Sequence, residues 1–231
     1  MKSYERLLKY VVVKTPSDEK SETIPSSKCQ FTLADMLAEE LKSLGVENAH
    51  VDDKCFVYGI IPATPGHENA TKLGFIAHMD TVSDFVDQEI RPVITENYNG
   101  EDLPLGDSGR VLTVKDFPHL PALKGRTLIT SDGNTILGVD DKAGIAEIMT
   151  MIERLRDEKI PHGQISVAFT PDEEIGTGSH SFDVEHFGAD FAYTLDGDGE
   201  AEIQFENFNA CKADFEITGF SVHPGSSKDT M

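Results

Sequence analysis

The sequence has little cysteine, few basic side chains and no long hydrophobic run. Only three of its 231 residues are cysteines, and Cys29, Cys55 and Cys211 stand apart with no Cys-x-x-Cys pair. An odd number of scattered cysteines favours reduced thiols over a disulfide framework. Any transition-metal site in this chain would therefore use oxygen and nitrogen ligands.

Acidic side chains outnumber basic ones by two to one. The chain has 41 Asp and Glu against 20 Lys and Arg, a formal charge of -21. Such a charge repels phosphate backbones and anionic lipids, which argues against nucleic acid or a membrane as a partner. No stretch approaches the roughly 20 apolar residues of a membrane span. Charges at Lys2, Glu5, Arg6 and Lys9 argue against a signal peptide. We therefore expect a cytoplasmic protein.

Helix and strand patterns alternate through the first 206 residues, which predicts an α/β domain whose sheet is flanked by helices. Apolar residues spaced three and four apart predict helices over 31–44 and 142–157, and a first helix is expected over 3–13. Continuous apolar runs predict strands over 57–61, 73–81, 164–170 and 190–195. Residues 83–126 carry short β-like pieces among turn signals, and we expect a β-rich excursion of the same domain.

Consecutive strand-like segments replace this alternation after residue 201, with Ile203, Phe205, Phe215, Ile217 and Phe220 as their apolar positions. The change predicts a catalytic domain over 1–206 and the first strands of a second, α+β lid domain over 207–231. Because so few residues follow, we expect this lid to be truncated.

Acidic residues or histidine follow four apolar segments, each of which we interpret as a strand. The run at 73–77 ends in His78 and Asp80, and a carboxylate at that spacing can fix one ring nitrogen while the other binds a metal. The carboxyl ends of strands in open α/β sheets meet at one crevice, so these side chains are expected to converge there. The other three segments are 135–139 before Asp140 and Asp141, 164–170 before Asp172, Glu173 and Glu174, and 190–195 before Asp196.

Each segment also has a plain structural interpretation. A histidine after a strand is often a hydrogen-bonded loop residue, an Asp-Asp pair can cap a helix, and an Asp-Glu-Glu triplet is usually a solvated turn. The repetition at four segment ends favours a metal site. Because Glu173 and Glu174 are adjacent, they cannot share one direction, so one can bind metal while the other moves a proton.

The motifs around these residues resemble a known family, the co-catalytic dinuclear zinc peptidases, which includes aminoacylases and carboxypeptidase G. The similarity covers the whole chain. Phe-Glu-Asn-Phe-Asn at 205–209 and Pro161-His162-Gly163 resemble the tripeptide aminopeptidases of that family. The other motifs are His-Met-Asp-Thr at 78–81, Gly-Val-Asp-Asp-Lys-Ala-Gly at 138–144, Phe-Thr-Pro-Asp-Glu-Glu at 169–174, Thr-Leu-Asp-Gly at 194–197 and His-Pro-Gly at 223–225.

The resemblance implies a role for each site residue. His78 and Asp196 would bind one zinc ion, Glu174 would bind a second, and Asp140 would bridge the two. The Asp140–Asp141 peptide would be cis. Asp80 would orient His78, Glu173 would be the general base, and His223 would polarise the scissile carbonyl.

The implied function is zinc-dependent release of the amino-terminal residue from tripeptides, with two zinc ions and a possible homodimer through a complete lid. Two alternatives stay open: a related metallo-deacylase or dipeptidase, and an inactive metal-binding fragment. The chain departs from the family in two places. A further histidine for the second zinc has no candidate after His223, and Asp198 stands where glycine is expected. We therefore expect weaker metal binding at the second site than at the first.

Overall fold

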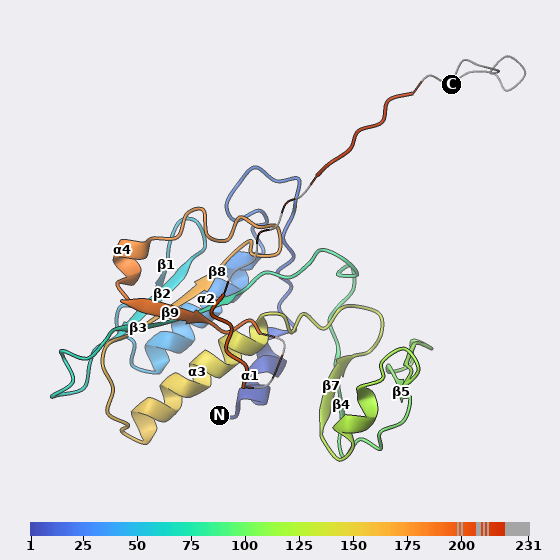
Figure 1. Cartoon of the computed structure of the whole chain (residues 1–231), viewed down its shortest axis with the longest axis horizontal. Helices are drawn as coiled ribbons and strands as arrows, with labels where there is room; N and C mark the ends of the chain where they lie inside the picture. The colour runs from blue at the N-terminus through green and yellow to red at the C-terminus, as the bar shows by residue number, and fades with distance from the viewer. Residues whose placement is uncertain (198, 200, 207–208, 210, 212, 220–231) are drawn as a thin grey trace, which may run out of the picture. The chain divides into compact units, whose positions relative to one another are not determined.

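The computed structural model describes residues 1–197, 199, 201–206, 209, 211 and 213–219 (Figure 1). The chain divides into two compact units, Met1–Asp196 and Gly197–Met231. All helices and strands of the described residues lie in the first unit, and none of these helices is long and apolar enough to cross a membrane. The predicted domain boundary at residues 206 and 207 falls inside the second unit and stays a prediction.

A five-stranded sheet forms the centre of the first unit. Its strands are β1 (His50–Val51), β2 (Val57–Ile61), β3 (Leu73–His78), β8 (Ile165–Thr170) and β9 (Phe191–Thr194), in the order β1-β2-β8-β3-β9. β3 pairs in parallel with both β8 and β9, whereas β2 runs antiparallel to β8. The carboxyl ends of β8, β3 and β9 therefore meet at one edge of the sheet (Figure 1).

Helices cover both faces of this sheet. Side chains of alternating strand residues enter different cores: Val57 and Val167 join the larger cluster, whereas Tyr58 and Ala168 join a smaller one with Phe187. The larger cluster also takes apolar side chains from the helices α1 (Ser3–Tyr10), α2 (Gln30–Ser43) and α3 (Lys142–Asp157), and the smaller one takes Phe187 from α4 (Val184–Phe187). The α/β architecture predicted from the sequence is confirmed.

The excursion between β3 and α3 contains two small antiparallel sheets. β4 pairs with β7, and β5 pairs with β6, around a separate core of Tyr98, Leu103 and Leu120. The excursion begins where the chain leaves the sheet after β3 and ends at the start of α3. Both of its ends therefore lie at the edge of the sheet where β8, β3 and β9 end. Its elements are β4 (Pro92–Thr95), β5 (Leu103–Pro104), β6 (Val111–Leu112), the 3-10 helix η1 (Leu120–Leu123) and β7 (Leu128–Ser131).

Three expectations from the sequence are wrong. The first helix ends at Tyr10 instead of residue 13, since Pro16 and its neighbours pair with Thr81 instead. Residues 135–139 form a loop, because Gly138 takes a positive φ of 70° that breaks extended backbone. Residues 201–206 and 213–219 contain no strand, because no described segment pairs with them. Phe220 lies outside the described residues.

One buried arginine joins the three helices that share a face of the sheet. Arg6 of α1 is 1% exposed, and its guanidinium contacts Glu40 of α2 at 2.7 Å and Glu153 of α3 at 3.1 Å. The same guanidinium donates to the Thr150 hydroxyl. Charge-assisted hydrogen bonds from a desolvated guanidinium are the strong kind.

We expect Arg6→Met to lower the free energy of unfolding by about 3 kcal/mol, because two glutamates lose their buried partner. Arg154→Ala is the matched control: it removes an exposed arginine of α3 that pairs with Glu158, and such pairs contribute little. Urea unfolding of both variants measures the difference. Equal midpoints for the two variants would contradict the role assigned to Arg6.

Candidate metal centre

His78 is the last residue of β3, and its imidazole is 2% exposed. Its Nδ1 lies 2.9 Å from the carbonyl oxygen of Asp80, which can only accept a hydrogen bond. Nδ1 therefore carries the hydrogen, and in the neutral ring Nε2 is left with its lone pair free. A neutral imidazole fixed in this way is the usual form of a metal-binding histidine.

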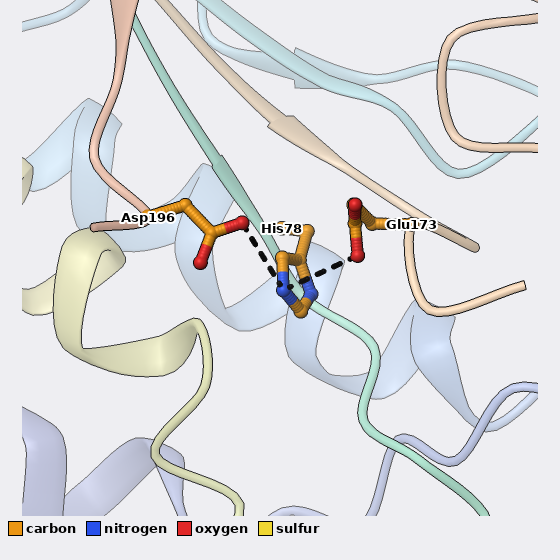
Figure 2. Close-up of side chains that lie close together, drawn as sticks. All are labelled: His78, Glu173 and Asp196. Carbon is orange, nitrogen blue, oxygen red and sulfur yellow. Dashed lines mark ion pairs between the residues drawn. The ribbon is translucent and has the colours of Figure 1, made fainter. Parts of the chain in front are cut away.

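Three carboxylates from different parts of the chain face His78 Nε2. Asp140 Oδ1 lies 3.0 Å away, Glu173 Oε2 3.8 Å and Asp196 Oδ2 3.9 Å. Figure 2 shows Glu173 and Asp196 on different sides of the imidazole. Asp140 lies just before α3, Glu173 lies in the loop after β8, and Asp196 lies in the loop after β9. The predicted convergence of His78, Asp140 and Asp196 is confirmed.

These side chains form two groups that could each hold a metal ion. His78, Glu173 and Asp196 make one, and His78, Asp140 and Glu174 make the other, with the ligand atoms of each group within 4.8 Å of one another. The adjacent glutamates thus belong to different groups, as expected if they point in different directions. The proposed division between a ligand and a general base stays a prediction.

Asp80 holds both His78 and the backbone of the glutamate pair. Its carboxylate is fully buried and accepts hydrogen bonds from the amides of Glu173 at 2.9 Å and Glu174 at 3.2 Å. One of its oxygens also lies 3.4 Å from His78 Nδ1. The sequence suggested only the contact with His78, whereas the structure adds the two amides.

The sequence left open whether the Asp140–Asp141 pair caps a helix or faces the metal site, and the structure gives these two positions to different residues. Asp141 is buried and caps α3 by accepting from the Gly144 amide at 3.1 Å, and it accepts from the His78 amide at 3.2 Å. The side chain of Asp140 is 72% exposed and faces the imidazole. The peptide between them is cis, as the resemblance implied. Asp141 therefore caps the helix, whereas the carboxylate of Asp140 faces His78 Nε2.

Burial and mutual repulsion shift the pKa values of the site. Burial alone would lower the pKa of His78, but the carboxylates of Asp80, Asp141 and Asp196 outweigh it and raise that pKa to about 10. Burial raises the pKa of Asp141 to about 8, although the charge on His78 opposes it. The pKa values of Glu173 and Glu174 are also raised, first by burial and then by neighbouring carboxylates, against the opposing effect of His78.

The donor set fits a divalent transition metal. It offers one imidazole nitrogen with its second nitrogen fixed, together with carboxylate oxygens crowded enough to repel one another. Zinc accepts nitrogen and oxygen ligands of this kind, and a cation would relieve the repulsion. Two predicted positions, His223 and Asp198, lie outside the described residues.

Sequence reasoning missed two buried aspartates, Asp141 and Asp172. Both were noticed only as members of acidic pairs or triplets. Asp172 is fully buried and accepts hydrogen bonds from Ser26 and Gln30 of a segment more than 140 residues earlier. No local pattern distinguishes such a carboxylate from its exposed neighbours.

Comparison with known sequences places this site in context. Residues 127–219 match the sequence model of peptidase family M20/M25/M40. The chain is 52% identical over 231 residues to peptidase T from Clostridium perfringens, covering 100% of this chain and 56% of that protein. It is 48% identical over 232 residues to peptidase T from Halothermothrix orenii, covering 100% and 57%. The chain thus spans a little over half the length of these curated relatives.

Two solved structures share the fold. Aminopeptidase PepT from Bacillus cereus gives a TM-score of 0.61 at 27% identity, over 86% of this chain and 43% of that one. A tripeptidase from Staphylococcus aureus gives a TM-score of 0.56 at 27% identity, over 84% and 44%. Both similarities cover most of the described first unit.

The raised pKa of His78 predicts that metal binding releases protons. At pH 7 the metal-free imidazole is protonated, whereas a ligating Nε2 must be neutral, so the apparent affinity should rise about tenfold per pH unit up to the pKa near 10. Calorimetry in buffers of different ionisation enthalpy counts the protons released at pH 7. An affinity that does not change between pH 6 and pH 8 would contradict this pKa assignment.

Proposed function

We propose that this chain carries the catalytic residues of a zinc-dependent aminopeptidase acting on tripeptides, on the premise that its similarity to peptidase family M20/M25/M40 and to peptidase T reflects common descent. The relatives named peptidase T support this reading, as do the structural neighbours named aminopeptidase and tripeptidase. Since the chain spans only about half the length of these relatives, activity and substrate remain part of the proposal.

One observation carries the proposal: a single buried imidazole nitrogen is faced by carboxylates from three separate segments. The distances from His78 Nε2 to Asp140, Glu173 and Asp196 are 3.0, 3.8 and 3.9 Å. A protonated core histidine needs two acceptors, and His78 has the Asp80 carbonyl at Nδ1 and Asp140 at Nε2. Metal binding explains why further carboxylates gather at the other nitrogen.

Each side chain has a distinct task in this proposal. His78 and Asp196 would hold one ion, Glu174 would hold a second, and Asp140 would contribute its carboxylate to both. Two zinc ions, when bound, supply a more acidic water and an electrostatic clamp for the oxyanion of the tetrahedral intermediate. Asp80 fixes His78 in the tautomer that leaves Nε2 free. His223, outside the described residues, keeps its proposed role at the scissile carbonyl.

Glu173 is suited to moving protons. Its side chain is 53% exposed, so it can reach a substrate in the open site, and its backbone amide is fixed by Asp80. Burial and nearby carboxylates raise its pKa, which brings a glutamate closer to the pH at which it both accepts and returns a proton. Glu173 would take a proton from the attacking water and deliver it to the leaving amine.

The acidic surroundings favour a peptide with a free amino terminus. Asp140, Glu173 and Asp196 present exposed or partly exposed carboxylates that attract an ammonium group. We also propose a cytoplasmic location, because Cys29, Cys55 and Cys211 are all free thiols. A homodimer through a complete lid domain rests on the resemblance to the family.

A tripeptide panel tests the proposed activity. The chain, stripped of metal and then reloaded with zinc, should release the amino-terminal residue of free tripeptides and leave amino-acetylated tripeptides intact. Cleavage of acylated amino acids or dipeptides instead would favour a related deacylase or dipeptidase. Zinc binding without release of any amino acid would favour an inactive metal-binding fragment.

The two adjacent glutamates should respond differently to the same substitution. Glu173→Gln should keep zinc and lower turnover by about 10²–10⁴-fold, because it removes a proton acceptor. Glu174→Gln should weaken zinc binding, because it removes a charged ligand. Zinc titration and tripeptide hydrolysis are measured on both variants, with the exposed Glu89→Gln as control. Equal loss of zinc in the two variants would contradict the division of roles.

A further inference from the structure

The segment between α1 and α2 lies against both strand ends that carry the site. We call residues 15–30, which end with the first residue of α2, the amino-terminal strap. Its first part follows the chain just after His78: the Thr15 hydroxyl donates to the Met79 carbonyl at 2.7 Å, and the Thr81 amide donates to the Thr15 carbonyl at 3.0 Å. The Ser17 amide donates to the Thr81 carbonyl at 3.0 Å. This end of the strap is fixed next to β3.

The other end of the strap holds the carboxylate of Asp172. The Ser26 amide and hydroxyl donate to it at 2.7 and 2.5 Å, and Gln30 Nε2 donates at 2.7 Å. All three residues are buried. Hydrogen bonds to an ionised carboxylate are short and strong, and a buried carboxylate that lost them would be left without compensation.

Asp172 immediately precedes the glutamate pair, in a turn that bends sharply at this residue. Its φ is +57°, a left-handed conformation that is uncommon for residues other than glycine. The turn closes with a hydrogen bond from the Thr177 amide to the Asp172 carbonyl at 3.1 Å. On the far side, Asp80 accepts from the amides of Glu173 and Glu174. The pair is therefore held between two buried carboxylates.

We propose that Ser26 and Gln30 are positioning residues, which act through Asp172 to keep the carboxylates of Glu173 and Glu174 directed at His78. The proposal rests on the proposed function, because it assumes that this pair carries the chemistry. It assigns a role in the site to a segment more than 140 residues earlier in the chain.

The physical reason lies in the left-handed backbone of Asp172. A residue in this region persists where surrounding contacts over-determine it. The three donors from the strap provide such contacts, so without them the turn gains freedom to relax toward commoner backbone angles. Displacements of about 1 Å at a catalytic group can lower the rate about 10²-fold, so even a small relaxation at Glu173 matters.

The test compares a double variant with three further variants. Ser26→Ala/Gln30→Met removes both side-chain donors, and methionine keeps a side-chain volume close to that of glutamine at position 30. Thr23→Ala removes a hydroxyl in the same strap that donates to the Pro25 carbonyl and does not reach Asp172. Tyr10→Phe removes a buried hydroxyl that donates to Glu40, far from the turn in sequence. Ser26→Thr keeps the hydroxyl donor and should retain wild-type behaviour.

Two measurements are made on each variant. Amide hydrogen exchange of the metal-free chain, followed by NMR, should be at least about tenfold faster at Glu173 and Glu174 in the double variant only. In the zinc-loaded chain, kcat for tripeptide hydrolysis should fall about tenfold or more with KM within about twofold. Tyr10→Phe should lower the unfolding midpoint without changing the exchange rates at Glu173 and Glu174 or kcat.

The outcomes separate this proposal from the proposed function. If wild-type chain hydrolyses no tripeptide, the proposed function fails, and the exchange rates of the metal-free chain still decide whether the strap positions the turn. Wild-type exchange rates at Glu173 and Glu174 in the double variant would overturn the proposal. So would a loss of kcat that Tyr10→Phe reproduces, because the effect would then be general destabilisation.

Discussion

The crowding of carboxylates around one buried imidazole is the constraint on which the rest of this structure depends. At an effective dielectric constant near 20, two unit charges 4 Å apart repel each other by about 4 kcal/mol. The side chains of the two candidate metal groups lie at about that separation, with ligand atoms within 4.8 Å. Without a metal ion the carboxylates repel one another, and the protonated imidazole of His78 offsets part of that repulsion, as its raised pKa indicates. The remainder of the fold must therefore hold these groups in place against their own repulsion.

Two sets of acidic residues with different contacts hold the site in place. Asp80, Asp141 and Asp172 are at most 4% exposed, and each accepts hydrogen bonds from backbone amides of the strand ends and turns. Asp140 and Glu173 are the immediate neighbours of two of them, yet their side chains are 72% and 53% exposed and face the imidazole. The buried acids fix the backbone, and their exposed neighbours are thereby directed at one point.

The sequence predicted the parts of this arrangement that depend on local pattern. The limits of α3 and β2 agree with expectation because amphipathic spacing and bounded apolar runs are local signals. The convergence of His78 and Asp196 followed from the rule that parallel strand ends share an edge, whereas Asp140 reaches the same edge from a loop. Residues 135–139 were mistaken for a strand, since an apolar run alone does not show the positive φ of Gly138. The tasks of Asp141 and Asp172 could not be predicted, because their partners are distant in sequence.

The location of bound zinc shows whether His78 and its surrounding carboxylates form a metal centre. Crystals of the zinc-loaded chain, measured at the zinc absorption edge, would show each ion by its anomalous scattering. We expect the strongest peak about 2.0–2.1 Å from His78 Nε2, with Asp196 beside it, and a weaker second peak between Asp140 and Glu174. Zinc bound elsewhere, such as at the surface rings of His50 and His186, with no peak at His78 Nε2, would contradict it.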